Sequence, residues 1–345
     1  MKTLRLRVDA AGMESEASRA AIAQAAEILR GGGTVAFPTE TVYGLGANAL
    51  DGAAVEKIFA AKERPSWDPV IVHIGEGELL ERVAAEIAEN ARRLMDSFWP
   101  GPLTLLLPKH AAVPERVTAG RERVGVRMPA HPVAHALLRA AGVPVAAPSA
   151  NRFGRTSATT AEHVAEDLEG RIDAILDGGE TTHGVESTVV DVREEGCRIL
   201  RPGVVTLEQI RAVAGGTVSM VGDASEDVSA SPGMGLRHYA PRARLALVDG
   251  EGVALQAAFA GVARGLEEAG DVVGLMLPDG FPQGARVAKV FAWGTWDDAE
   301  ELAQRLFAGL RWLDAEGATA IVCPMPAAEG IGLAIRDRLL KASRR

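Results

Sequence analysis

Apolar positions alternate between helical spacing and short continuous runs from the start of the chain. Helical spacing holds over residues 18–29, and the glycines at 31–33 then end that helix. Residues 34–37 read as a strand. Asp51 is expected to N-cap a second helix, which must end before Pro65 because proline disfavours the helical conformation at the residue preceding it. The opening pattern therefore predicts helix, strand, helix.

The same alternation continues to about residue 212. We predict strands over 70–74, 103–107, 124–128, 143–147, 174–176 and 187–191. We predict helices over 79–97, 132–140 and 160–168. Two sequence pairs match the capping box and predict helix starts just after them, namely Thr159 with Glu162 and Thr206 with Gln209. Interleaved strands and helices indicate the α/β class.

The pattern changes after residue 212, where Gly, Ser, Asp and Pro dominate. We predict a linker over 213–243 between a first domain at 1–212 and a smaller α/β domain at 244–345. The expected strands of the second domain are 245–248, 272–277 and 320–322, and its expected helices are 253–268, 297–313 and 330–342. A chain of 345 residues is long enough for two cores at about 150 residues per domain.

The amino-acid composition indicates a globular protein and argues against several other classes. Hydrophobic residues make up 47% and charged residues 24%, which excludes wholesale disorder and fibrous repeats. No apolar run approaches the ~18 residues of a membrane span, and the start MKTLRLRVDA has no apolar signal region, so a cytoplasmic location without membrane attachment is expected. Two distant cysteines build neither a disulfide framework nor a four-cysteine zinc site. The acidic excess, 46 against 37, means that any anionic ligand must be held by local cations.

Two familiar site signatures fit poorly. Gly44, Gly46 and Ala49 match G-x-G-x-x-A, but a proline and three polar residues separate them from the strand, which is wrong for the tight dinucleotide-binding turn. His131 and His135 stand four residues apart and could bind zinc, yet no third ligand is evident, which favours a surface or packing role. The P-loop pattern is absent. We therefore predict neither NAD nor zinc.

Polar residues follow several of the predicted strands, where ligands gather in open α/β sheets. They occur at 38–46, at 62–73, at 123–129, at 148–157, at 184–191 and at 199–203. Each segment also has an explanation without a ligand: an ordinary turn, an arginine exposed to solvent, or a cation that interacts with a helix dipole. Lys62 and Arg64, at what we expect to be an exposed helix exit, combine a point charge with a planar donor fork and so suit a polyphosphate or a carboxylate.

Eight segments occur in the order found in one enzyme family: PTETVYGLGANAL, AAKERP, VIVHI, WPGPLTLLLP, VGVRMPAHP, APSANRFGRTSATT, GVESTVVD and ILRPG. Over about residues 20–205 the chain therefore resembles the threonylcarbamoyl-adenylate synthase family, and SPGMGLRHYAPR and GIGLAIRDRLLKA are similar to its long, two-domain members. The resemblance implies a YrdC-like twisted open α/β sheet with a concave cleft, plus a second, smaller, Rossmann-like α/β domain.

The resemblance also implies a nucleotidyltransferase. Such an enzyme joins L-threonine, bicarbonate or CO₂, and ATP, with Mg²⁺ accompanying the ATP, into threonylcarbamoyl-AMP and pyrophosphate. A separate transferase complex uses the product to modify a tRNA adenosine next to the anticodon. Because a carbamate anion must approach a polyanion, cations must offset the repulsion. Lys62 and Arg64 are the expected catalytic cations.

Two sets of site residues follow from the resemblance, motif by motif. Those expected at ATP are Lys62, Arg64, Asp68, Arg123, Ser149, Asn151, Ser157, Arg201 and Tyr239. Those expected at L-threonine are Thr41, His73, Arg127, Ala147 and Ser187. Family members commonly have Asn where Asp68 stands and Thr where Arg123 stands, so the Asp68 charge is expected to need Mg²⁺ or Arg64 as an offset. Tyr239 is expected to latch the linker over the cleft.

Two questions remain open at this point, and one related enzyme is excluded. His73 suits a general base by type, or it only orients the threonine, and no dedicated base is evident. An RNA-binding module without catalysis, or weak tRNA contact, would use the same cations, although aromatic residues for stacking are scarce at 4%. The related carbamoyltransferase of hydrogenase maturation carries a similar domain together with zinc fingers, which two cysteines cannot build.

Overall fold

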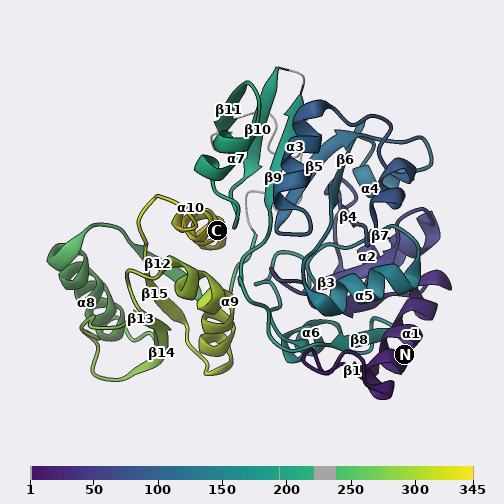
Figure 1. Cartoon of the computed structure of the whole chain (residues 1–345). Helices are drawn as coiled ribbons and strands as arrows, with labels where there is room; N and C mark the ends of the chain where they lie inside the picture. Colours follow the sequence, from purple (N-terminus) through teal and green to yellow (C-terminus); the bar gives the residue numbers. More distant parts are fainter. Residues whose placement is uncertain (1, 194, 221–237, 345) are drawn as a thin grey trace. The chain divides into compact units, whose positions relative to one another are not determined.

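The chain divides into two compact units in this computed structural model, which describes residues 2–193, 195–220 and 238–344 (Figure 1). The first unit comprises Met1–Phe153, Ser157–Thr182 and Glu186–Gly235. The second comprises Gly154–Thr156, His183–Val185 and Leu236–Arg345, so two tripeptides that lie between segments of the first unit in the sequence belong to it. The boundaries 1–212, 213–243 and 244–345 stay a prediction, and residues 221–237 of the predicted linker lie outside the described residues.

A large mixed sheet forms the centre of the first unit. Over the described residues its strand order is β1-β8-β2-β3-β7-β4-β6-β5-β9-β10-β11. The strands are β1 (Leu4–Arg7), β2 (Val35–Phe37), β3 (Gly44–Asn48), β4 (Ile71–His73), β5 (Leu103–Pro108), β6 (Arg123–Arg127), β7 (Val145–Ala146), β8 (Ala174–Asp177), β9 (Thr188–Arg193), β10 (Gly196–Arg201) and β11 (Thr217–Met220). The sheet contains parallel pairs, such as β4 with β6, and antiparallel pairs, such as β5 with β6.

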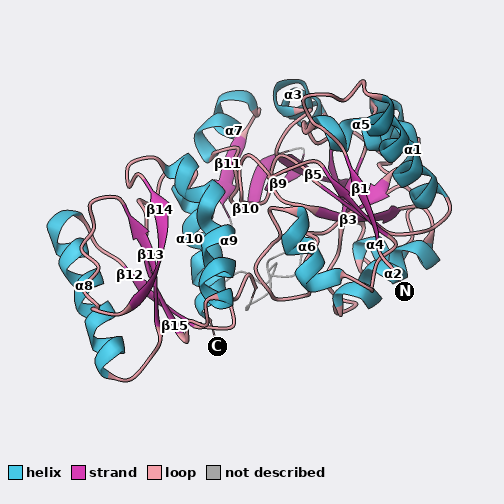
Figure 2. Cartoon of the chain, turned by 90° about the horizontal axis from the view of Figure 1, so that it is seen from below, coloured by secondary structure: helices cyan, strands magenta, loops and turns pink. Residues whose placement is uncertain are grey.

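Helices cover both faces of this sheet. They are α1 (Glu16–Arg30), α2 (Gly52–Lys62), the 3₁₀ helix η1 (Gly77–Arg82), α3 (Glu89–Phe98), α4 (Glu115–Thr118), α5 (Pro132–Ala141), α6 (Ala161–Leu168) and α7 (Leu207–Val213). Figure 2 shows α1 and α5 over one face and α2 and α6 over the other. The two faces carry separate apolar cores, with Leu29 and Leu137 in one and Ile58 and Val164 in the other. Burial of both faces is the main stabilising term.

Local capping follows the sequence at several helix ends. The Asp51 side chain accepts hydrogen bonds from two N–H groups at the start of α2. Thr206 and Gln209 form the complete capping box predicted for α7. The box predicted at Thr159 is wrong by one residue, because the Thr160 side chain caps α6. Thr159 instead bonds through its carbonyl to the N–H of Thr181, which holds it outside the helix.

The helix predicted over 79–97 is wrong, because the chain there forms η1 and α3 with irregular backbone between them. In that gap the N–H of Ala85 donates to the carbonyl of Pro108, and the N–H of His110 donates to the carbonyl of Val83. The backbone therefore bonds to the end of β5 instead of to its own preceding turn. Apolar spacing alone does not reveal such distant partners.

Glycine explains why β3 was predicted as part of a loop. A Cβ on Gly46 would lie 2.7 Å from Cγ1 of Val145 and 2.8 Å from a ring carbon of Phe37. Only glycine fits this close approach between strands, and its weak strand propensity hides the strand from a pattern search. Strand β11 lies at 217–220, within the segment predicted as an irregular linker.

The second unit is a smaller α/β layer structure, as predicted. Its strands β12 (Arg244–Val248), β13 (Val273–Pro278), β14 (Ala288–Gly294) and β15 (Ala320–Pro324) form a parallel sheet in the order β12-β15-β13-β14. Figure 2 shows α8 (Gly252–Glu268) on one face, with α9 (Ala299–Ala315) and α10 (Gly332–Ser343) on the other. Strand β14 was not predicted. In the described part of the chain no helix is long and apolar enough to cross a membrane.

The two short loops of the second unit, 154–156 and 183–185, are held by contacts inside that unit. Nη2 of Arg311 in α9 donates to the carbonyl of Thr156 at 2.6 Å. The N–H of Ala240 donates to the carbonyl of Gly154 at 2.8 Å. Gly184 has φ +70°, and a Cβ there would lie 2.4 Å from the carbonyl oxygen of Gln304. Both loops are therefore closely packed on the C-terminal segment.

Candidate active site

Polar side chains occupy one face of the large sheet across neighbouring strands. His73 of β4 and Arg127 of β6 are register partners, and the pairing of Leu105 with Val126 places Thr104 of β5 beside Arg127. Leu105 and Val126 point the other way, into the apolar core. Because side chains alternate between the faces of a strand, His73, Arg127 and Thr104 form a row on the opposite face.

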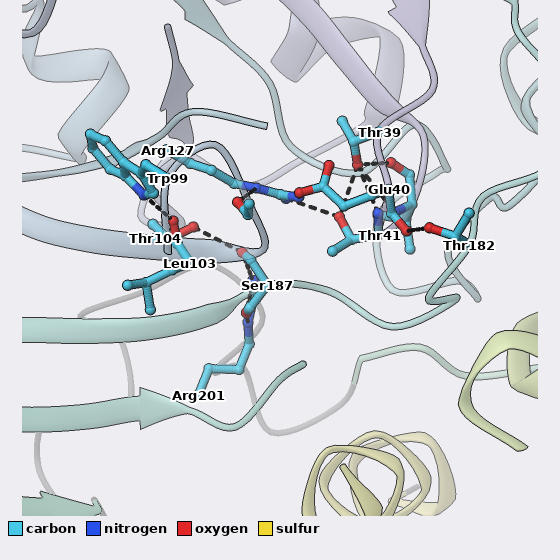
Figure 3. A network of polar contacts seen from close by, with 12 residues as sticks. Thr39, Glu40, Thr41, Trp99, Leu103, Thr104, Arg127, Thr182, Ser187 and Arg201 are labelled. Carbon is cyan, nitrogen blue, oxygen red and sulfur yellow. Dashed lines mark hydrogen bonds and ion pairs between the residues drawn. The ribbon is translucent and has the colours of Figure 1, made fainter. Parts of the chain in front are cut away.

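Arg127 is the centre of this row and is 3% exposed. Its Nη2 lies 2.7 Å from Oε1 of Glu40, and its Nη1 donates to Oγ1 of Thr41 at 2.9 Å (Figure 3). Its Nε donates to the carbonyl of Gly101 at 3.1 Å. The guanidinium is thus fixed from several directions, which presents it in one orientation.

The loop after β2 is held by the hydroxyl of Thr39. That hydroxyl donates to the carbonyl of Val42 at 2.6 Å and accepts from the N–H groups of Thr41 and Val42. The hydroxyls of Thr39 and Thr41 lie 2.8 Å apart. This side-chain turn aims both Glu40 and Thr41 at Arg127, as Figure 3 shows.

Charge in this part of the site is balanced. Burial disfavours the charged form of Glu40, but the Arg127 guanidinium overrides it and holds the pKa of that carboxyl below its ordinary value. Burial, helped by the nearby positive charge of Arg127, lowers the pKa of His73 to about 3. Glu40 and Arg127 therefore form an ion pair at neutral pH, and His73 beside them is a neutral imidazole.

The pKa of His73 gives a testable pH dependence of stability. Between pH 6.5 and about 3 the unfolded chain binds a proton at residue 73 that the folded chain does not, so stability falls as the pH is lowered through this window. We expect His73→Gln to lose less unfolding free energy than the parent between pH 6.5 and 4, as measured by urea denaturation. Identical pH profiles would contradict the neutral, buried imidazole.

Ser187 and Arg201 extend the row to β9 and β10. The hydroxyl of Ser187 lies 2.8 Å from that of Thr104. Arg201 donates to the carbonyl of Ser187 from Nη2 at 3.0 Å and from Nε at 3.2 Å (Figure 3). The structure thus brings together Ser187, expected at L-threonine, and Arg201, expected at ATP.

Lys62 and Arg64 are buried, so the expectation of an exposed helix exit is wrong. Lys62 is 1% exposed, and its Nζ donates to the carbonyls of Ser149 and Asn151, each at 2.5 Å. The reason is Glu63, whose left-handed backbone (φ 56°) ends α2 and turns the chain back against the 149–153 segment. Lys62, Ser149 and Asn151, all expected at ATP, are therefore brought into contact.

Arg64 and Asp68 form a buried ion pair, with Nη2 to Oδ2 at 2.9 Å. Nη2 of Arg64 also donates to the carbonyl of Pro69 at 2.6 Å. Burial raises the pKa of Asp68, and the charges of Arg64 and Lys62 oppose this effect. The sequence analysis expected either Mg²⁺ or Arg64 to offset the negative charge of Asp68, and Arg64 does so in the structure.

The other expected ATP residues of the first unit lie apart or with new partners. The hydroxyl of Ser157 donates to Oε1 of Glu186 at 2.5 Å. Arg123 lies four residues from Arg127 on β6, and its Nε is 2.8 Å from Oδ1 of Asp191, so the structure does not bring it to the Arg127 row. Its contact with nucleotide stays a prediction.

Ala147 and Tyr239 complete the expected set. Ala147, expected at L-threonine, is buried after β7, where its N–H donates to the carbonyl of Ile71 at 2.8 Å. Tyr239 belongs to the second unit, where its ring stacks on Phe307 at 5.6 Å and lies 5.3 Å from the guanidinium of Arg338. The proposed lid falls largely on residues 221–237, which lie outside the described residues.

Sequence reasoning gave no role to Glu40, Thr104 or Glu186. Glu40 was visible as a carboxylate in a polar loop after a strand. Thr104 had a weaker signal, a single hydroxyl within the apolar run LTLLLP. Glu186 lies beside Ser187 in the motif GVEST. Position within a motif does not show which neighbour pairs with a distant arginine or serine.

Within the described ranges no group of three His, Cys, Asp or Glu side chains is placed to hold a metal ion. His131 instead caps α5, where its Nδ1 accepts from the N–H of Val133 at 3.2 Å. This contact agrees with the packing role favoured from the sequence. The Mg²⁺ expected with ATP stays a prediction.

The amino-acid sequence matches two family models and several known proteins. A family model described as "Telomere recombination" matches residues 27–203, and one described as "Threonylcarbamoyl-AMP synthase, C-terminal domain" matches 205–344. The threonylcarbamoyl-AMP synthase of Pyrococcus abyssi is 46% identical, over 92% of this chain and 93% of its own length. That of Bacillus subtilis is 45% identical over 99% and 98%.

The fold is shared as well. The crystal structure of P. abyssi Sua5 complexed with L-threonine has a TM-score of 0.92 and 44% sequence identity, covering 99% of this chain and 98% of that one. The similarity extends over both units. It confirms the α/β class predicted from the sequence.

Proposed function

The chain belongs to the threonylcarbamoyl-AMP synthase family, and from this premise we propose that it makes threonylcarbamoyl-AMP and pyrophosphate from L-threonine, bicarbonate or CO₂, and ATP. The observation that carries the proposal is the row of buried cations and hydroxyls across β4, β6, β5, β9 and β10. Through this row Thr41, Arg127 and Ser187, expected at L-threonine, lie near Arg201, expected at ATP. The relatives support an enzyme over an RNA-binding module.

The chemistry requires what this row provides. The threonine amine adds to CO₂ and gives a carbamate and a proton, and a carbamate oxygen then attacks the α-phosphorus while pyrophosphate leaves. Two anions must meet, so fixed positive charge lowers the barrier most when it is already oriented. Arg127 and Arg201 in the row, and Arg64 outside it after α2, are each held by carbonyl or carboxylate oxygens. They do not need to reorganise during the reaction.

Positioning accounts for the remaining catalytic work. Hydroxyls at Thr41, Thr104 and Ser187 lie along the row and can orient a small polar substrate. His73, whose pKa of about 3 makes it a weak base, is suited to orienting threonine rather than removing its ammonium proton. Holding carbamate and ATP in line supplies most of the rate enhancement in this scheme.

Other parts of the proposal depend on the sequence resemblance. Mg²⁺ would enter with the phosphates of ATP and neutralise part of their charge. Asp68 already pairs with Arg64, so it is not assigned as a metal ligand. A cytoplasmic location, transfer of the product to a tRNA-modifying complex and weak tRNA contact complete the proposed role.

The test is pyrophosphate release by the purified chain with ATP, Mg²⁺, bicarbonate and single amino acids. We expect release to require bicarbonate and to be fastest with L-threonine, and label from bicarbonate to appear in an adenylate product. Omitting each component in turn is the control. Salt-sensitive RNA binding without pyrophosphate release would favour the RNA-binding module, and release that is indifferent to threonine would contradict the substrate assignment.

A further inference from the structure

Glu63 has a left-handed backbone at the end of α2, where glycine is the usual residue. Its φ is 56° and its ψ is 39°. A side chain costs free energy in this conformation because its Cβ crowds the backbone, and glycine avoids that cost. Glu63 lies between Lys62 and Arg64, the two expected catalytic cations. A glutamate at this position therefore indicates that its side chain makes contacts that glycine would lack.

The Glu63 carboxylate joins two arginines from different parts of the chain. Its Oε2 lies 2.5 Å from Nη2 of Arg152, and its Oε1 lies 2.8 Å from Nη1 of Arg171. Arg152 is in the loop after β7, and Arg171 is in the turn between α6 and β8. The hydrogen bonds from Arg152 and from Arg171 hold the pKa of the carboxyl below its ordinary value. Glu63 is therefore charged at neutral pH and bridges the two segments.

Arg152 belongs to the segment that surrounds Lys62. Inside the protein, Nζ of Lys62 donates to the carbonyls of Ser149 and Asn151. The pair of Glu63 with Arg152 connects the same two segments on the solvent side, where these side chains are 53% and 31% exposed. The end of α2 is thus tied to this segment from two sides.

The bridge affects the placement of charged groups more than the stability of the fold. Exposed ion pairs contribute little to the free energy of unfolding, because water screens them. A small displacement of a fixed cation nevertheless weakens its bond to a phosphate oxygen, because charged hydrogen bonds depend on distance and direction. Loss of the bridge is therefore expected to lower the affinity for a phosphate ligand in a protein that still folds.

We propose that Glu63 is a positioning residue for the binding of ATP. Its two arginine partners let it hold the turn 62–64 against the segment 149–153, which orients the cations of that turn toward the phosphates. This inference rests on the proposed function and adds to it a residue that acts on ATP only through its neighbours. Glu63 itself does not contact the nucleotide, since a carboxylate would repel the phosphates.

The experiment replaces Glu63 by the residue that its backbone favours. Binding of ATP with Mg²⁺ and of L-threonine to the full chain is measured by calorimetry. Glu63→Gly allows the same left-handed turn but removes the bridge, so its urea midpoint should stay close to that of the parent. We expect the Kd for ATP to rise about 3- to 10-fold and the Kd for L-threonine to stay within about twofold. The difference in ATP affinity should shrink at high salt, which screens exposed ion pairs.

The matched control is Glu56→Gln. Glu56 lies on the same helix and forms a half-exposed ion pair with Arg116 at 2.7 Å. Its replacement should leave the Kd for ATP unchanged. Glu63→Gln is a second variant of the bridge, which loses the charge but keeps the length of the side chain. Its affinity for ATP should lie between those of the parent and Glu63→Gly.

A double variant tests whether Arg152 acts through the bridge. Arg152→Ala should weaken ATP binding about as much as Glu63→Gly does, and the double variant should lose no more than either single variant. Additive losses would mean that Arg152 contacts ATP by itself, which contradicts the bridge.

Two further results would overturn the inference. An unchanged Kd for ATP in Glu63→Gly would remove the positioning role. Equal losses of affinity for ATP and L-threonine, together with a lower urea midpoint, would mean that Glu63 only stabilises the fold. Pyrophosphate release by the parent tests the proposed function separately. A parent that releases pyrophosphate with threonine, combined with an unchanged Kd for ATP in Glu63→Gly, would defeat this inference alone.

Discussion

Arg127→Met is expected to abolish threonine-dependent pyrophosphate release and to lower the free energy of unfolding by about 3–5 kcal/mol. Methionine fills a similar volume but leaves the buried Glu40 carboxylate without its cation. Breaking a buried ion pair from one side is costly because the surviving charge stays desolvated. Urea denaturation and pyrophosphate assays on the same preparations measure both effects.

The pH dependence of this variant should be reversed in sign. In the parent, the lowered pKa of Glu40 means that its contribution to stability is present at neutral pH and is lost as the pH falls through the folded pKa. Without Arg127, burial raises that pKa, so acidification should now stabilise the variant near pH 5. Adding Glu40→Gln to Arg127→Met should recover stability but not activity. Parent-like stability of the single variant would contradict a buried, coupled pair.

Arg64→Ala is expected to reduce pyrophosphate release about 100- to 1,000-fold, the usual effect of removing one preorganised electrostatic group. The same change should destabilise the fold, because it strands the buried Asp68 beside two carbonyls. This second effect follows from the burial of Arg64, which the expectation of an exposed helix exit had missed. Turnover at saturating ATP and unfolding by urea measure the two losses separately.

A double variant distinguishes the two roles of Arg64. Arg64→Ala with Asp68→Asn removes both charges of the pair, so stability should return toward the parent value. Activity should not return, since the cation for the phosphates is still missing. A double variant with parent-like turnover would exclude Arg64 from catalysis, and Asp68→Asn alone serves as the control for the loss of the carboxylate.

Most of the fold could be predicted because the spacing of apolar residues within a short stretch of sequence indicates whether that stretch forms a helix or a strand. The bounds of strands β4, β5 and β6 were predicted to within one residue, because short, mostly apolar runs mark them in the sequence. The predictions failed where contacts with residues distant in the sequence determine the local structure. Strand β3 depends on the fit of Gly46 against Phe37, and the break between η1 and α3 depends on backbone bonds to β5.

The site was partly predictable for the same reason. The resemblance to the enzyme family placed Thr41, Arg127 and Ser187 in one set, and the structure links all of them through the Arg127 row. The burial of Lys62 could not be predicted, because it depends on contact with Ser149, which lies almost ninety residues away in the sequence. Glu40 was missed because its partner lies on a different strand.

The two loops at 154–156 and 183–185 determine how this protein could be recombined with its relatives. They are packed on the C-terminal segment, and each leads directly into a member of the bonded pair formed by Ser157 and Glu186. A chimaera joined at a single crossover near residue 212 would combine the loops 154–156 and 183–185 of one protein with the C-terminal segment of another. The native packing between these loops and that segment would then be lost. Exchange of C-terminal domains therefore calls for three grafts made together, and natural substitutions in α9 are constrained by residues encoded some 150 codons upstream.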